Sequence, residues 1–415
     1  MPTIAILGTC DTKLEELLFL HSKISNSHAT NALLIDVGRT ETEHETIGIS
    51  QKELLQKYGN NQEVDQLPRA KLIEVMADCA TKAVKVLLER RSIHGIIAAG
   101  GSCGTSLASA VMRDAVPIGF PKMIVSTVAS GDTGPIVGET DITMMYSVVD
   151  IAGLNQVLQN ILSNAAAAIA GMAASYADKE VPGSSASKKR VGITMFGVTT
   201  PAVDVIRRHL EAQYGCEIYV FHATGHGGQA MERLVRENAL DAVLDLTTTE
   251  VCDFLTGGVM SAGPRRLDAA AEAGIPNIVS VGATDMTNFG PKSTVPERYK
   301  DRRLYEHNPV VTLMRTSEEE ARQVGNFIAE KLKKHVKRTD LVQVWLPDGG
   351  ISLISTPEGP FADPKADTAL FRSLKEGLDG SGIEIVEDKR SINDPGFATD
   401  IAEALMAKTQ WRRKS

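Results

Sequence analysis

Residues 93–107 read Ile-His-Gly-Ile-Ile-Ala-Ala-Gly-Gly-Ser-Cys-Gly-Thr-Ser-Leu, an apolar run that ends in glycines and continues with small and hydroxyl-bearing residues. This order predicts a buried strand, a tight turn and the first turn of a helix. Glycines let the backbone approach an anion closely, and the first amides of a helix point outward without partners. The stretch therefore predicts a phosphate site, unless its glycines only make a turn. The residues that we expect at this site are Gly100, Gly101, Ser102, Gly104 and Thr105.

Strands and helices alternate on both sides of this stretch. Short apolar strands separated by helices are typical of a parallel sheet that is covered on both faces. The sequence therefore predicts an α/β protein with two Rossmann-like, doubly wound domains and mostly parallel sheets. The predicted strands are 3–7, 32–37, 93–98, 123–127, 191–196, 217–221, 242–246 and 277–281.

The division into two domains follows from length and from one segment without periodicity. A chain of 415 residues is too long for one ordinary core. Residues 181–189, Val-Pro-Gly-Ser-Ser-Ala-Ser-Lys-Lys, contain mostly small and polar types, as linkers do. We predict an N-terminal domain over 1–180, a linker over 181–189 and a second domain over 190–415.

The end of the second domain has a different pattern. Ser317 and Glu320 have the spacing of a capping box, and Asp394 precedes a proline as the N-cap of a last helix does. Between them, apolar runs at 341–345 and 351–354 flank Pro-Asp-Gly-Gly, which predicts a hairpin. We therefore expect an antiparallel edge on the second sheet.

Composition excludes several classes of protein. A formal net charge of -8 disfavours a nucleic-acid partner. No apolar run comes close to the roughly 20 residues that a membrane span needs, and the N-terminal residues do not have the pattern of a secretory signal. We therefore expect a cytoplasmic protein without a membrane partner. Five cysteines without paired-ligand spacing indicate reduced thiols and neither disulfides nor structural zinc.

The loops that follow the strands of the first domain are rich in glycine, hydroxyl groups and carboxylates. Ligands of doubly wound sheets bind outside the carboxyl ends of the strands, so these loops predict one polar pocket. Asp132 and Asp141, with Asp11, are candidate ligands for Mg²⁺ beside the phosphates, although each acid alone also fits a helix cap or a turn. The further residues that we expect to bind the nucleotide are Gly8, Asp11, Thr12, Lys13, Asp36, Gly38, Thr127, Gly131 and Asp132.

In the second domain, His222, His226 and Glu250 follow predicted strands and are the candidate catalytic residues. The two histidines are four residues apart, which favours a metal pair only on a helix, and this stretch contains three glycines. Histidines that bond the backbone or a substrate are the alternative.

Taken together, these motifs resemble a known family. They are Gly8-Thr9-Cys10-Asp11-Thr12-Lys13, Asp36-Val37-Gly38, Gly100-Gly101-Ser102-Cys103-Gly104-Thr105, Ser130-Gly131-Asp132-Thr133 and His226-Gly227-Gly228. The combination resembles the ATP-binding family typified by the N-terminal part of the tomato mosaic virus resistance protein. The resemblance runs along nearly the whole chain and implies two Rossmann-like subdomains, ATP at the first, and a homodimer. It supplies no established reaction.

Three interpretations of function stay open, and with them the question of whether the protein is an enzyme. In the first, an ATP-dependent enzyme brings a small polar substrate at the interdomain cleft to the phosphates of ATP. In the second, the nucleotide sets the state of a regulatory, protein-binding module. In the third, a hydrolase or lyase is centred on His222, His226 and Glu250.

Overall fold

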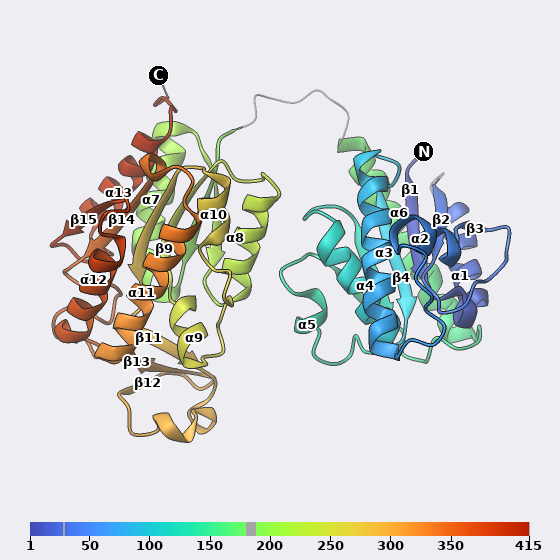
Figure 1. Ribbon diagram of the computed structural model, residues 1–415, viewed down its shortest axis with the longest axis horizontal. Coiled ribbons are helices and arrows are strands. Elements are labelled where there is room, and N and C mark those ends of the chain that lie inside the picture. The colour runs from blue at the N-terminus through green and yellow to red at the C-terminus, as the bar shows by residue number, and fades with distance from the viewer. Residues whose placement is uncertain (28–29, 180–187, 415) are drawn as a thin grey trace. The chain divides into compact units, whose positions relative to one another are not determined.

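The structure, a computed structural model, describes residues 1–27, 30–179 and 188–414 (Figure 1). The chain divides into two compact units, Met1–Ser185 and Ala186–Ser415. Only the last two residues of the predicted linker 181–189 belong to the described part of the chain. Each unit is described below by itself.

Unit 1 contains a six-stranded sheet in the order β3-β2-β1-β4-β5-β6, in which every neighbouring pair is parallel. Its strands are β1 (Thr3–Gly8), β2 (Asn31–Asp36), β3 (Ile47–Ile49), β4 (Gly95–Gly100), β5 (Lys122–Ser126) and β6 (Thr143–Tyr146). Its helices are α1 (Cys10–Ser25), α2 (Gln51–Tyr58), α3 (Arg69–Glu89), α4 (Ser102–Ala115), α5 (Gly134–Val137) and α6 (Gln156–Lys179).

Helices cover both faces of this sheet. One hydrophobic cluster joins the sheet to α1 and α6, and another joins it to α2, α3 and α4. The helix that follows β1 therefore lies on one face, and the helix that follows β4 lies on the other. Since β1 and β4 are neighbours, the switch point of the sheet, where doubly wound folds bind ligands, lies between their carboxyl ends.

Helix α6 corrects the expectation that no segment of the chain is long and apolar enough for a membrane span. Gln156–Asp178 is long and apolar enough to cross a membrane by length and composition, with a mean hydropathy of 1.3. Alanines separate its larger apolar residues, so that no single run looks like a span in the sequence. Leu158, Leu162 and Ile169 are fully buried in the core of unit 1, and a single helix of this kind is a weak indication of a membrane protein.

Unit 2 contains a parallel sheet in the order β15-β14-β10-β9-β7-β8 and a separate antiparallel sheet in the order β11-β13-β12. The prediction of two α/β domains with mostly parallel sheets is confirmed. The strands are β7 (Arg190–Met195), β8 (Glu217–His222), β9 (Ala242–Thr247), β10 (Asn277–Gly282), β11 (Met286–Phe289), β12 (Leu304–Asn308), β13 (Val311–Arg315), β14 (Val342–Pro347) and β15 (Glu384–Asp388). The helices are α7 (Thr200–Tyr214), α8 (His226–Arg236), α9 (Glu250–Thr256), α10 (Asp268–Ala273), α11 (Glu318–His335), α12 (Pro364–Leu378) and α13 (Pro395–Lys408).

The predicted hairpin at 341–354 was wrong. β14 is fully buried and pairs in parallel with β10 and β15, while residues 351–354 form bends and turns. The glycines after β14 turn the chain toward β15: a Cβ at Gly349 would lie 2.6 Å from the carbonyl oxygen of Lys389. Both predicted helix starts are confirmed, because Ser317 and Glu320 form the capping box and the Asp394 carboxylate accepts hydrogen bonds from two amides of α13.

Candidate functional site

A cavity of about 590 Å³ lies at the switch point of unit 1. Its walls come from the loops after β1 and β2 and from the first turns of α3 and α4, so that segments far apart in the sequence line one space. It is lined by Thr9, Asp11, Thr12, Lys13, Val37, Arg39, Arg69, Leu72, Ile73, Gly101, Ser102, Cys103, Gly104, Leu107 and Asp150. Six of the predicted nucleotide-binding residues line this cavity, together with several residues that the sequence did not reveal; the six are Asp11, Thr12, Lys13, Gly101, Ser102 and Gly104.

One end of the cavity is the N-terminus of α4. Gly101 is the N-cap and no side chain caps the helix. The first backbone bond of this helix runs from Thr105 N to Gly101 O, and within the described ranges the amides of residues 102–104 have no partner. A Cβ on Gly104 would meet nothing within 4 Å, and one on Gly101 only the Thr127 hydroxyl at 3.7 Å. Free donors thus face open space, as an anion site requires.

The neighbouring residues brace this turn. A Cβ at Gly100 would lie 3.2 Å from Gly104 Cα, a tight contact, so glycine at this position eases the close approach of α4 to β4. Thr105 is buried, and its hydroxyl oxygen lies 2.7 Å from that of Ser126 at the end of β5. Thr105 therefore ties α4 to the sheet and does not offer its hydroxyl to the cavity.

Two carboxylates hold the loops after β1 and β2 together. Asp36 is fully buried, and its Oδ1 accepts hydrogen bonds from the amides of Cys10 at 3.0 Å and Gly38 at 2.9 Å. Asp11 Oδ2 accepts from the amide of Arg39 at 2.8 Å. A Cβ at Gly38 would lie 2.6 Å from Asp11 Oδ1, so glycine permits this approach. Burial raises the pKa of Asp36.

Each of these carboxylates keeps one oxygen without a partner. Asp11 Oδ1 and Asp36 Oδ2 are buried and accept no hydrogen bond from any described residue. Oxygen atoms of carboxylates are the ligands that Mg²⁺ prefers, and an unpaired buried oxygen is costly unless something binds it. Each of these oxygens could therefore bind a cation or a ligand hydroxyl group, and Asp11 is the one that lines the cavity.

Lys13 and Gly8, both predicted to bind the nucleotide, contact other parts of unit 1 in the structure. Lys13 leaves helical geometry with φ of -140° and donates its ammonium group to the carbonyl oxygen of Ile151. A Cβ at Gly8 would lie 2.4 Å from the side chain of Leu17 in α1, so Gly8 serves helix packing. Thr12 hydrogen-bonds Thr9 through their hydroxyl groups at 2.8 Å.

The opposite wall of the cavity is apolar and was missed in the sequence. Val37, Leu72, Ile73 and Leu107 belong to one hydrophobic cluster. Two cations border this wall. The Arg39 guanidinium donates to three carbonyls of residues 64–67, whereas Arg69, at the start of α3, has no partner among the described residues.

The other predicted metal ligands do not join the cavity. Asp132 is exposed and accepts a hydrogen bond from the amide of Gly134, which is a turn contact, as is the bond from the Gly131 amide to Val128. Asp141 pairs with the buried Lys122 at 2.5 Å. Because Lys122 begins β5, Asp141 lies at the amino end of the sheet, away from the site.

The candidate catalytic residues of unit 2 are not brought together as a reactive set. Glu250 is fully buried and accepts hydrogen bonds from the amides of Gly225 at 2.7 Å and Gly228 at 3.0 Å, and from Arg266 Nε at 2.7 Å. Arg266 also forms a bidentate pair with Asp245. Glu250 therefore fixes a loop, because all its contacts are structural. His226 is exposed at the start of α8. His222, also exposed, lies with its ring 5.6 Å from that of Phe196.

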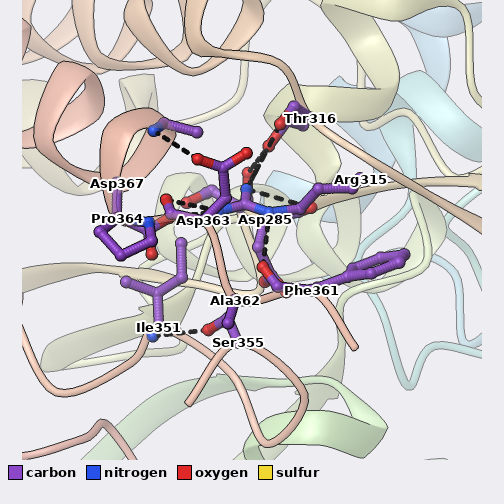
Figure 2. A network of polar contacts seen from close by, with 12 residues as sticks. Asp285, Arg315, Thr316, Ile351, Ser355, Phe361, Ala362, Asp363, Pro364 and Asp367 are labelled. Atoms are coloured by element: carbon purple, nitrogen blue, oxygen red, sulfur yellow. Dashed lines mark hydrogen bonds and ion pairs between the residues drawn. The ribbon is translucent and has the colours of Figure 1, made fainter. Parts of the chain in front are cut away.

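Side chains fill the carboxyl edge of the parallel sheet in unit 2 near the ends of β10 and β14. Figure 2 shows Arg315 between Asp367, Thr316 and the carbonyl of Phe361, with Asp285 beside it. Arg315 is 3% exposed and its ion pair with Asp367 measures 2.6 Å. Phe361 and Ile354, from the loop after β14, pack in a small apolar cluster over this edge.

Asp285 is the exception in this network. Its Oδ2 accepts a hydrogen bond from the Ser352 hydroxyl at 2.8 Å, while its Oδ1 is buried without a partner among the described residues. Burial raises the pKa of Asp285 to about 6.

One further group has the geometry of a metal site. Asp268, Glu272 and His335 place ligand atoms within 4.8 Å of one another. However, Lys331 donates to Asp268 at 2.8 Å, and an ammonium group in this position takes the place of a metal ion.

Comparison with known proteins places the chain in a family. Residues 2–178 match the N-terminal domain of uncharacterised protein family UPF0261, and residues 188–409 match its C-terminal domain. The chain belongs to the UPF0261 family. A UPF0261 protein of Clostridium tetani is 46% identical over 97% of this chain and 98% of its own length. The ToMV resistance protein Tm-1 of Solanum lycopersicum is 38% identical over 98% of this chain, which spans 55% of the tomato protein.

Solved structures similar to this UPF0261 protein are distant. A UDP-N-acetylglucosamine 2-epimerase has 12% identity and a TM-score of 0.20, with 67% of this chain and 78% of that chain covered. MurG of Acinetobacter baumannii has 11% identity and a TM-score of 0.23, with 68% and 79% covered. Neither likeness bears on function.

Proposed function

We propose that this UPF0261 protein binds ATP together with Mg²⁺ in the cavity of unit 1. The observation that carries the proposal is the uncapped N-terminus of α4, whose three free amides face open space at the switch point of a doubly wound sheet. The motifs that resemble the ATP-binding family imply the same ligand class.

The chemistry of the walls supports a nucleotide over a free phosphate ion. The amides of residues 102–104 bind phosphate oxygens, and Arg69 adds a positive charge. Val37, Leu72, Ile73 and Leu107 offer an apolar surface to the base and the sugar. An anion alone would leave this surface exposed to water.

Asp11 and Asp36 fit the metal ion better than Asp132 or Asp141, because only the first two have buried oxygens without partners. When bound, Mg²⁺ neutralises phosphate charge. Asp11 would hold it through Oδ1 while Oδ2 keeps the loop after β2 in place.

Unit 2 favours a binding function over a hydrolase or lyase centred on Glu250. A general acid or base must reach the substrate, and Glu250 is fully buried with both oxygens engaged. We therefore propose nucleotide binding without assigning a reaction.

Two glycine substitutions test the proposal. Gly104→Val places a β-branched side chain in the phosphate space, at a position where a Cβ would meet nothing within 4 Å. Gly171→Val is the matched control, since Gly171 is exposed within α6 and its Cβ would also meet nothing within 4 Å. By calorimetry with ATP and Mg²⁺, we expect the first variant to bind at least about tenfold more weakly and the control to bind normally. Equal affinity in both would remove α4 from the site.

A further inference from the structure

The cavity of unit 1 separates groups that bind phosphate from groups that contact a base. The phosphate end contains the free amides of α4 and the hydroxyl of Ser102. The other wall, from the loop after β2 and from α3 and α4, contains the apolar side chains of Val37, Leu72, Ile73 and Leu107. A protein distinguishes adenine from guanine by hydrogen bonds to the edge of the base, so the groups near this wall decide selectivity.

The backbone amides that follow β2, beside this wall, are engaged. The amide of Val37 donates to Gly8 O at 2.9 Å, and that of Gly38 to Asp36 Oδ1 at 2.9 Å. The next two amides, of residues 39 and 40, both donate to Asp11 Oδ2. The four consecutive amides after β2 therefore have partners within the protein and are not offered to a base.

Three polar side chains near the wall, those of Arg39, Asp150 and Lys13, also have partners within the protein. Arg39 donates through Nη1 to three carbonyls, the closest at 2.6 Å. Asp150 accepts from the amide of Ile151 at 2.8 Å, and Lys13 donates to the carbonyl of the same residue. Arg69 is the cavity cation that has no partner among the described residues, and a guanidinium group matches phosphate oxygens.

We infer that this cavity selects nucleotides by their phosphates and not by their base, so that purine nucleoside triphosphates bind alike. The inference rests on the proposed function and specifies its ligand class. The base packs on hydrocarbon, which accepts any planar ring, and the interactions that depend on charge are made with the phosphates.

Calorimetry on the full-length protein with Mg²⁺ tests this inference. ATP and GTP should bind within about threefold of each other, and each should lose about tenfold or more in affinity when the γ-phosphate is removed. A tenfold or greater preference for ATP over GTP would overturn the inference and leave the proposed function intact. Binding of neither triphosphate would overturn both.

Arg69→Gln sharpens the test, because it removes one charge at the edge of the cavity and no contact within the described protein. It should weaken ATP and GTP by the same factor, about three- to tenfold, and leave adenosine unchanged. A loss confined to one of the two triphosphates would show that Arg69 contacts the base, which would contradict the inference.

Discussion

The loops at the carboxyl edges of the two parallel sheets have similar composition, but the edge is open in unit 1 and closed in unit 2. In unit 1, glycine, serine and aspartate surround a cavity of about 590 Å³ with free amides and the unpaired Oδ1 of Asp11. In unit 2, equally polar loops are packed shut, and Thr247, Thr248, Thr249 and Glu250 are fully buried. A polar strand end is therefore a candidate ligand site only when its hydrogen-bonding groups lack partners within the protein.

Buried charge explains the closed edge. Arg266 is 1% exposed and satisfies Asp245 and Glu250 at once, which lets Glu250 hold the loop before α8. Such a network fixes geometry and leaves nothing for a substrate. The open edge instead keeps its unsatisfied groups, as expected where a ligand completes the structure.

The largest expected effect is on the closed edge. Arg266→Met should lower the free energy of unfolding of unit 2 by about 3–5 kcal/mol, because it leaves Asp245 and Glu250 buried without a counter-charge. Urea unfolding followed by tryptophan fluorescence measures unit 2 specifically, since both tryptophans, Trp345 and Trp411, lie there.

Arg207→Met is the matched control for this prediction. Arg207 pairs with Glu211 at 3.1 Å, but the two side chains are 37% and 43% exposed, so the loss should stay below about 1 kcal/mol. Similar losses in both variants would contradict the view that burial makes the Arg266 network essential to unit 2.

The second prediction concerns the unpaired oxygen of Asp285. Burial raises its pKa from 3.8 to about 6, so the folded protein holds this proton more tightly than the unfolded chain does. Below pH 4 both states are protonated and there is no penalty. As pH rises from 4 to 6 the carboxyl group destabilises the fold, and above pH 6 the penalty is complete at about 3 kcal/mol.

Asp285→Asn removes this titration while its carbonyl oxygen still accepts from Ser352. Relative to the wild type, the variant should therefore gain stability as pH rises from 4 to 7, measured by urea unfolding of unit 2 at each pH. A difference between the two proteins that stays constant with pH would show that Asp285 has an ordinary pKa in the folded state.

The sequence predicted the architecture well because alternation and helical periodicity are local. It failed at the loop after β14, where a turn signal between two apolar runs looks the same for a hairpin and for a strand buried in a parallel sheet. It placed Gly101, Ser102, Gly104 and Asp11 at the cavity, since loops after neighbouring strands share one edge. The sequence could not show that both oxygens of Glu250 accept hydrogen bonds within the protein. One donor, Arg266, is sixteen residues away, and its contact with Glu250 depends on tertiary packing.

The third prediction tests the carboxylate of the open edge. Asp11→Asn should keep the loop in place, since an amide oxygen still accepts from the Arg39 and Thr40 amides. It should reduce the gain in ATP affinity caused by Mg²⁺ by about tenfold, because a charged metal ligand is lost. Calorimetry with Mg²⁺ and with a chelator measures this gain. An undiminished gain would assign the metal ion to other groups.

The smallest effect is expected at Asp132. Comparing Asp132 with Asp11 distinguishes an aspartate that only forms a turn after a strand of unit 1 from one that binds the metal ion. Asp132 is exposed, and its only contact among the described residues is the Gly134 amide at 3.0 Å, which asparagine also accepts. Asp132→Asn should therefore change ATP affinity by less than about twofold with or without Mg²⁺, in the same titrations as Asp11→Asn. If Asp132→Asn instead reduced the gain caused by Mg²⁺ as strongly as Asp11→Asn, the loop after β5 would have to move to the cavity when nucleotide binds. The open edge would then be completed by a conformational change as well as by a ligand.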